Sequence, residues 1–225
     1  MNEKIKSTNK QVKFYWESLG QEYDFDPRKK YLIYYPGCFC CPHRSHFNTI
    51  ANFTYLDNAK FFIHQGGNPR RHGIPYKLNR TIWEIYINEL LPSDKFALVG
   101  RTTNTDQTSD LVNHKFTREA DTVVFIAGNE DYDPDTKEKE ARRKKYKNRF
   151  RGLLKSGKEV IFLYLDRPTH SPESVSATKF SKAVTRYRDL PEDKKYKKLC
   201  KYLPDGLSEK AIKYIIRKLD ECDLH

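Results

Sequence analysis

The sequence has no long hydrophobic run. No apolar stretch approaches the roughly 18 residues that a membrane-spanning helix requires, and the mean hydropathy is −0.85. The first residues, Met1–Gln11, are polar and lack the apolar segment of a secretory signal. We therefore expect no membrane span and no secretion, and we expect the protein to be cytoplasmic.

Cysteine is also scarce. There are five in 225 residues, and three of them are Cys38, Cys40 and Cys41. An odd, clustered set is not the framework of a disulfide-stabilised secreted domain, so a reducing compartment fits better. His43 and His46 follow closely, and all five side chains are of zinc-ligand types. Their spacing matches no common zinc pattern and no second cysteine pair lies elsewhere, so we predict no protein-bound metal.

Acidic residues are outnumbered by basic ones. The 30 Asp and Glu residues stand against 42 Lys and Arg residues, which gives a formal net charge of +12. Such an excess indicates an anionic partner such as a nucleotide, a nucleic acid or an acidic membrane surface. A solvated basic surface accounts for the charge equally well. The stretches Arg142–Arg151 and Lys194–Lys201 contribute to the excess.

Short apolar runs alternate with segments of helical periodicity. The runs, each bounded by turn residues, are Tyr31–Tyr35, Ala59–His64, Phe96–Val99, Thr122–Ala127 and Glu159–Leu165. The helical segments are Ser45–Leu56, Asn79–Leu91, Lys137–Leu154, Thr178–Tyr187 and Glu209–Leu219. Near-continuous apolar strands are typical of a parallel sheet covered on both faces. The predicted fold is therefore α/β: a Rossmann-like open parallel sheet of about five strands with helices on both faces, plus C-terminal helices.

The rest of the chain is weakly patterned. Residues 1–30 form a charged N-terminal extension, in which Val12–Leu19 suits a short helical turn. Residues 31–225 form a single domain that includes the C-terminal helical region. Within it, Asp189–Pro204 is interpreted as a basic connector between the last two helices.

Residues capable of phosphate chemistry gather directly after the first predicted strand. Gly37 permits close approach of the backbone to a phosphate, and His43 and His46 are three residues apart at a helix start. The helix N terminus supplies N–H groups and a partial positive charge, and we expect Ser45 to cap it. The structural alternative is that the cysteines pack in the core and the histidines lie on the surface.

A second such segment, Val175–Ser181, follows the fifth strand and opens a helix. The hydroxyls of Ser176 and Thr178 lie near N–H groups of the helix start and suit phosphate oxygens. Taken alone, an ordinary helix N-cap is the better interpretation of this segment.

Together the two segments resemble the signatures of the cytidylyltransferase-like nucleotidyltransferase superfamily. The first segment resembles G-x-F-x-P-x-H-x-G-H, and the residues that carry the resemblance are Gly37, Phe39, Pro42, His43 and His46. The second resembles I-S-S-T-x-x-R. The chain departs from the pattern at Ser45, where the family has Gly, and at Ser181, where it commonly has Arg. Between the segments, Phe125–Gly128 followed by Asn129–Asp131 resembles the family's nucleotide-contacting turn.

The resemblance implies transfer of a nucleoside monophosphate from a nucleoside triphosphate to a phosphate-bearing acceptor, with release of pyrophosphate. AMP from ATP is favoured, with an acceptor such as nicotinamide mononucleotide, and magnesium bridges the phosphates. The implied residues are His43, His46 and Lys179 for catalysis; Gly37, Cys38, Phe39, Ser45, Gly128, Asp131, Ser176, Thr178 and Lys182 for the nucleotide; and Arg70, Arg71 and Arg80 for the acceptor.

Other interpretations stay open at this point. A cytidylyltransferase acting on a phosphorylated alcohol is the nearest alternative, and a catalytically degenerate nucleotide- or nucleic-acid-binding protein is the second. Nucleic acid is thus a secondary partner, and the oligomeric state is open. Trp83 suits stacking on a ligand ring, although a core position on its helix is the stronger expectation.

Overall fold

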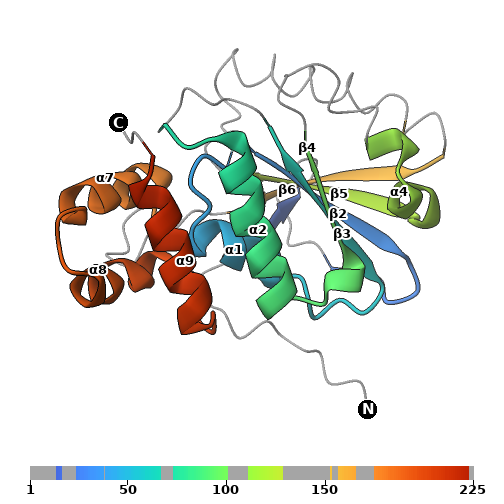
Figure 1. The fold of residues 1–225 in the computed structure, drawn as a ribbon. Helices are drawn as coiled ribbons and strands as arrows, with labels where there is room; N and C mark the ends of the chain where they lie inside the picture. Colours follow the sequence, from blue (N-terminus) through green and yellow to red (C-terminus); the bar gives the residue numbers. More distant parts are fainter. Residues whose placement is uncertain are drawn as a thin grey trace.

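The protein is built around one six-stranded sheet (Figure 1). The computed structural model describes residues 14–16, 24–37, 39–66, 73–100, 111–128, 153, 157–165 and 175–222. The strands are β1 (Phe14–Trp16), β2 (Tyr31–Gly37), β3 (Ala59–Gln65), β4 (Phe96–Gly100), β5 (Thr122–Gly128) and β6 (Glu159–Leu165). Strands β2 to β6 are parallel, which confirms the predicted sheet, and β1 joins its edge antiparallel to β6.

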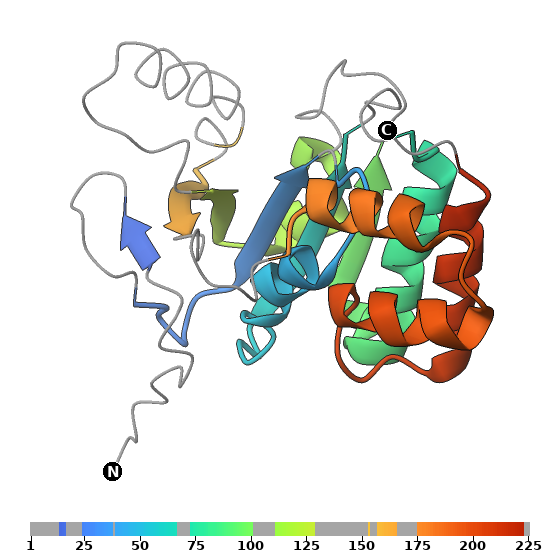
Figure 2. The ribbon, with the colours of Figure 1, turned by 90° about the vertical axis from the view of Figure 1, so that its left-hand side faces the viewer.

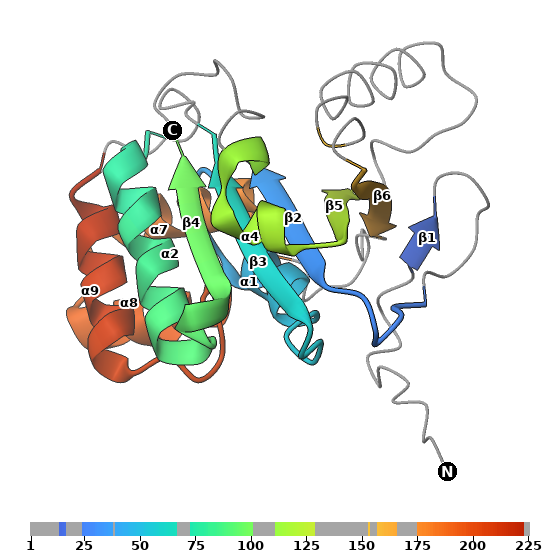
Figure 3. The same ribbon diagram turned by 90° about the vertical axis from the view of Figure 1, so that its right-hand side faces the viewer.

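The strand order is β1-β6-β5-β2-β3-β4, and Figure 3 shows the strands in this sequence across the molecule. The chain runs from β2 through β3 to β4 at one edge and then returns to place β5 on the other side of β2. The direction of winding therefore reverses between β2 and β5. In open α/β sheets, ligands bind beyond the carboxyl ends of the strands at such a reversal. Here those ends are Gly37 and Gly128.

Both faces of the sheet are covered, as predicted. The helices are α1 (Arg44–Ala51), α2 (Tyr76–Leu90), α4 (Lys115–Glu119), α7 (Ala177–Tyr187), α8 (Glu192–Leu199) and α9 (Glu209–Asp220), with single 3-10 turns η1 (Ser93–Lys95) and η3 (Cys200–Tyr202). Successive residues of β2 pack alternately into two different hydrophobic clusters, one on each face of the sheet. Tyr31 and Ile33 pack with residues of α1, α2, α7 and α9, and Leu32 and Tyr34 pack with Phe116 of α4. Figure 3 shows α4 alone on its side of the sheet among the labelled helices.

The C-terminal helices form the outer layer of the first face. In α9 the apolar stripe Ile212, Ile215, Ile216 and Leu219 is buried. Ser208 caps this helix: its hydroxyl accepts from the Ala211 amide and donates to Glu89 of α2. The stripe and the cap together place α9 against α2, as Figure 1 shows.

Two predicted segments differ from the structure in the type of element they form. Residues 14–16, within the predicted helical turn Val12–Leu19, form β1, because their backbone pairs with β6. The predicted connector Asp189–Pro204 contains α8, which has acidic residues in its first turn and lysines in its last, an arrangement that suits the helix dipole. Of the α8 residues only Leu199 is buried, so there was no apolar stripe to recognise.

The remaining differences concern helix limits. The helix predicted over Ser45–Leu56 ends at Ala51, and the one predicted from Asn79 begins at Tyr76. Helix α4 was not predicted, since five residues are too few to establish a helical period. The predicted helix Lys137–Leu154 lies outside the described residues, apart from the buried Leu153. Over the described part of the chain, no helix has both the length and the apolar character to cross a bilayer.

We expect Ile215→Ala to lower the free energy of unfolding by about 2–5 kcal/mol, because it removes three carbons from a fully buried site on α9. Urea unfolding followed by circular dichroism measures this. Lys210→Ala, at an exposed position of the same helix, is the control and should change stability by less than about 0.5 kcal/mol. Equal losses in the two variants would mean that α9 is not anchored by its apolar stripe.

Candidate functional site

The loop between β2 and α1 follows the carboxyl end of the central strand. Two of its residues have left-handed backbone conformations, Phe39 with φ 41° and Cys41 with φ 77°. Residues other than glycine rarely adopt this conformation. A Cβ on Gly37 would lie 2.7 Å from the Phe39 ring. The space that Gly37 leaves is therefore filled by this ring, so the glycine is already required by the fold.

The loop also departs from the signature in the position of its proline. The signature places Pro two residues after Phe, where this chain has Cys41, and Pro42 follows one position later. A proline ring holds φ near −65° and is incompatible with the φ of 77° at Cys41. The shift of the proline thus belongs with the left-handed turn of this loop.

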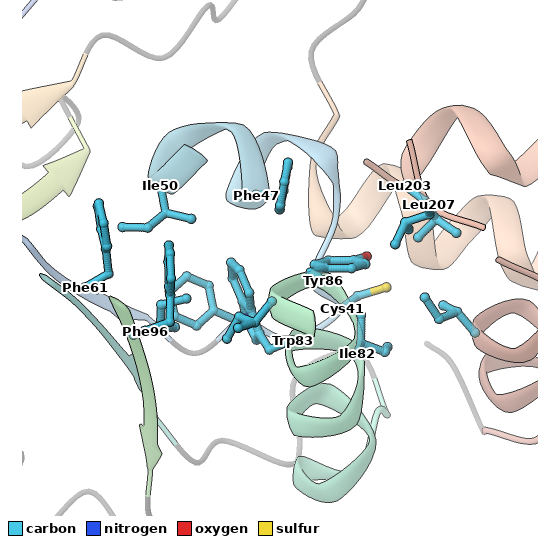
Figure 4. Close-up of a cluster of buried hydrophobic side chains, with 14 of the residues drawn as sticks. Cys41, Phe47, Ile50, Phe61, Ile82, Trp83, Tyr86, Phe96, Leu203 and Leu207 are labelled. Atoms are coloured by element: carbon cyan, nitrogen blue, oxygen red, sulfur yellow. The ribbon is translucent and has the colours of Figure 1, made fainter. Parts of the chain in front are cut away.

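Two buried side chains of α2 support the loop, and neither was predicted to have this role. The Asn79 Oδ1 accepts from the Cys41 amide at 3.0 Å, and the Tyr86 hydroxyl donates to the Pro42 carbonyl at 3.0 Å. Burial raises the pKa of Tyr86 well above its ordinary value, so the hydroxyl stays protonated and remains a donor. Figure 4 shows Tyr86 and Cys41 side by side within the core.

The two histidines of the motif stand together at the start of α1. Their rings stack with centroids 3.8 Å apart and an interplanar angle of 26°. His43, rather than the predicted Ser45, is the N-cap, and its Nδ1 accepts from the Ser45 amide at 3.2 Å. A neutral His43 therefore carries its proton on Nε2, where it is a donor. His43 is buried, whereas His46 is partly exposed and makes a T-shaped contact with the Phe39 ring.

The start of α1 is attached to the start of α7. The Ser45 hydroxyl donates to the carbonyl of Val175 at 3.0 Å, which joins the two motifs directly. Beside it, Arg44 donates to the Leu203 carbonyl and pairs with Asp205 at 3.1 Å. The first turn of α1 is thereby fixed to both the second motif and the segment that precedes α9.

Helix α7 begins at the second motif. Ser176 is its N-cap, and the Ser176 hydroxyl accepts from the Lys179 amide at 3.2 Å. Thr178, Lys179 and Lys182 are exposed. Ser181 is 2% exposed and donates to the Thr178 carbonyl at 3.3 Å. The two lysines therefore lie on a different side of the helix from the position where the family commonly has Arg.

Both helix starts suit an anion. Neither α1 nor α7 has an acidic residue in its first turn. The first amides of each helix point out of its end, and the helix dipole adds a partial positive charge there. Because Ser45 and Val175 are hydrogen-bonded, these two positive ends are held next to each other. An elongated anion with several phosphates is the ligand that matches such a pair.

The other predicted residues are more scattered. Gly128 ends β5 at the reversal point of the sheet. Arg80 lies in the second turn of α2 and pairs with Glu84 at 2.9 Å on its own helix. Trp83 is fully buried, as expected for a core residue. The predicted residues that lie outside the described part of the chain are Cys38, Arg70, Arg71 and Asp131.

Cys40 and Cys41 of the first motif differ from metal ligands in their surroundings. Both are buried and take part in no disulfide, and burial raises the pKa of Cys41 well above its ordinary value. A thiol with such a pKa stays protonated and is a poor ligand. Among the described residues, no three His, Cys, Asp or Glu side chains gather in a way that would hold an ion.

Among known proteins, similarity is found to solved structures. No family model and no curated protein matches the chain. Similar solved structures include Plasmodium falciparum nicotinic acid mononucleotide adenylyltransferase complexed with APC, with 14% identity and a TM-score of 0.45 over 86% of this chain and 98% of that one. Its complex with NaAD gives 14% identity and 0.46 over the same shares. Thermotoga maritima TmcAL bound with alpha-thio ATP gives 14% identity and 0.45 over 85% of this chain and 56% of that one. These values are too low to transfer any activity to this chain.

Proposed function

We propose that the protein is a nucleotidyltransferase that moves a nucleoside monophosphate from a nucleoside triphosphate to a phosphate-bearing acceptor. The observation that carries the proposal is the hydrogen bond between Ser45 and Val175. It joins two helix N termini without acidic residues, at the reversal point of a parallel sheet, and each bears a motif of the family that the sequence resembles. AMP from ATP is the favoured group, with nicotinamide mononucleotide as the favoured acceptor.

In the proposed reaction, an oxygen of the acceptor phosphate attacks the α-phosphorus in line with the leaving group. The bond from the α-phosphorus to its bridging oxygen breaks, and pyrophosphate leaves with that oxygen. The protein contributes by positioning the reactants and by neutralising charge on the phosphoryl oxygens, with no covalent intermediate.

The first motif serves the reacting phosphate in this scheme. Because the Nδ1 of His43 accepts from the Ser45 amide, a neutral His43 carries its proton on Nε2, and this is the group that would donate to a triphosphate oxygen. His46 stacks on His43 and serves the α-phosphate as charge develops there. In this proposal the stacking and the T-shaped contact with Phe39 hold the rings in place, as preorganised charge stabilisation requires.

The second motif serves the departing phosphates. Ser176 and Thr178, at the start of α7, hold the β- and γ-phosphates, and Lys179 or Lys182 supplies positive charge from the exposed side. Arg80 would serve the acceptor by exchanging its Glu84 partner for a phosphate.

Magnesium fits this proposal as a companion of the nucleotide. The described residues offer positive helix ends, histidines and lysines at the site, and no three acidic, histidine or cysteine side chains that would form a cage. Such surroundings suit an ion that is held mainly by phosphate oxygens. Bound in that way, it would add Lewis-acid neutralisation of the phosphate charge.

The function is tested by incubating the protein and magnesium with ATP or CTP and an acceptor. The acceptors are nicotinamide mononucleotide, phosphopantetheine and phosphocholine, and pyrophosphate release is the readout. Turnover with ATP and nicotinamide mononucleotide is the expected result. Turnover with CTP and phosphocholine would indicate the cytidylyltransferase alternative, and no turnover with any pair would contradict the proposal.

We expect His46→Ala to reduce the rate of pyrophosphate release by about 100- to 1,000-fold, the usual cost of losing one group that stabilises transition-state charge. His114→Ala is the control, because His114 is likewise a histidine at the start of a helix, where it caps α4 through Nδ1, but α4 lies on the opposite face of the sheet. Circular dichroism should show both variants folded. Unchanged turnover in His46→Ala would refute the assigned role.

We expect Ser45→Ala to raise the KM for ATP roughly three- to tenfold, since it removes one hydrogen bond with a net worth of about 0.5–1.5 kcal/mol that holds the phosphate-binding helix ends together. Thr49→Ala is the control: it removes a hydroxyl that bonds the Ser45 carbonyl within α1. Steady-state kinetics over a range of ATP concentrations separates the two. A similar rise in both variants would mean that general helix stability, rather than the link to α7, sets the KM.

A further inference from the structure

The charged residues on the outer side of α7 are all cations. Its exposed charged residues are Lys179, Lys182 and Arg186, spaced three and four positions apart, so they share one face of the helix. The helix contains no acidic residue. This row begins beside the second motif and extends along the whole helix.

Helix α8 adds a second row of positive charge. Lys194, Lys197 and Lys198 are exposed and share one face at helical spacing, and Lys201 follows in the next turn. Figure 2 shows α7 and α8 side by side on the near side of the molecule. The α7–α8 surface is therefore defined by seven exposed cations: Lys179, Lys182, Arg186, Lys194, Lys197, Lys198 and Lys201.

The distribution of ion pairs distinguishes this surface from its surroundings. On the inner side of α8, Lys195 pairs with Asp220, and on α9, Lys213 pairs with Glu209. Within the described part of the chain, no ion pair engages Lys182, Arg186 or the three outer lysines of α8. The nearby acidic residues are Asp189, in the turn between the two helices, and Glu192 and Asp193, in the first turn of α8. The surface has positive charge that the described residues do not neutralise.

We propose that the α7–α8 surface binds the phosphate backbone of a nucleic acid strand. Two rows of cations match a polymer with regularly spaced negative charges, and binding of this kind releases counterions and needs no base-specific contact. An acidic membrane is the weaker match, because a helix that lies on a membrane buries an apolar face. Tyr55 is the only large hydrophobic residue that is exposed in the described ranges, and it lies on neither helix. The proposal does not depend on nucleotidyl transfer, since binding is measured without a triphosphate.

The test is fluorescence anisotropy of the full chain with a labelled single-stranded RNA of about 20 nucleotides, and with DNA of the same sequence, at several salt concentrations. The triple variant Lys194→Gln, Lys197→Gln, Lys198→Gln removes three charges from the surface. The matched control, Lys77→Gln, Lys115→Gln, Arg118→Gln, removes three exposed charges from α2 and α4. Thermal melting and circular dichroism check that both variants remain folded.

Salt-dependent binding by the wild type is the expected result. The α8 variant should bind about 100-fold more weakly at 0.1 M salt, and its slope of log affinity against log salt should fall by roughly 2, given about 0.7 per phosphate contact. The control should bind like the wild type. Equal weakening in both variants would mean that only net charge matters and would overturn the proposal. Binding to phosphatidylserine vesicles without binding to either oligonucleotide would overturn it in favour of a membrane.

Discussion

The hydrogen bond from the Ser45 hydroxyl to the carbonyl of Val175 connects residues 130 positions apart and fixes the relation of α1 to α7. Its net contribution to stability is modest, about 0.5–1.5 kcal/mol. Its effect on the geometry matters more. The partial positive charge at a helix N terminus acts only within about one turn of that end, so two such ends reinforce each other only when they are close. Arg44 strengthens the arrangement through Leu203 and Asp205.

The same loop depends on α2 from the other side. Left-handed backbones such as those of Phe39 and Cys41 cost about 1–3 kcal/mol each and persist only where the surroundings fix them. Asn79 and Tyr86 supply buried hydrogen bonds to this loop, and the Phe39 ring packs against Trp83. The packing of the core therefore also fixes the conformation of the loop at the candidate site. A change at Asn79 or Tyr86 would remove a hydrogen bond from the loop that leads to the histidines.

The sequence predicted the five parallel strands well, because buried strands are continuous apolar runs ended by Gly or Pro. It failed for β1, whose conformation depends on pairing with β6, and for α8, which buries little apolar surface. The motifs located the loop and the start of α7. Asn79 and Tyr86 were missed, because their bonds span 38 and 44 residues and such contacts leave no local pattern. The arginines at 70 and 71 lie outside the described residues and stay predictions.

The two serines that depart from the family's signatures are both engaged by the fold. A hydroxyl has one proton to donate, and Ser45 directs it to Val175 while Ser181 directs it to Thr178. Neither proton is then directed at a phosphate, and neither side chain is a cation. In the proposed function, positive charge would accordingly come from helix amides and from lysines on the exposed side of α7. Lysine acts as a point charge without the two-pronged geometry of arginine, so attraction for phosphates would come with some loss of orientation. The stacked His43 and His46 rings, in contact with the Ser45 amide and with Phe39, are the elements that we propose restore that orientation.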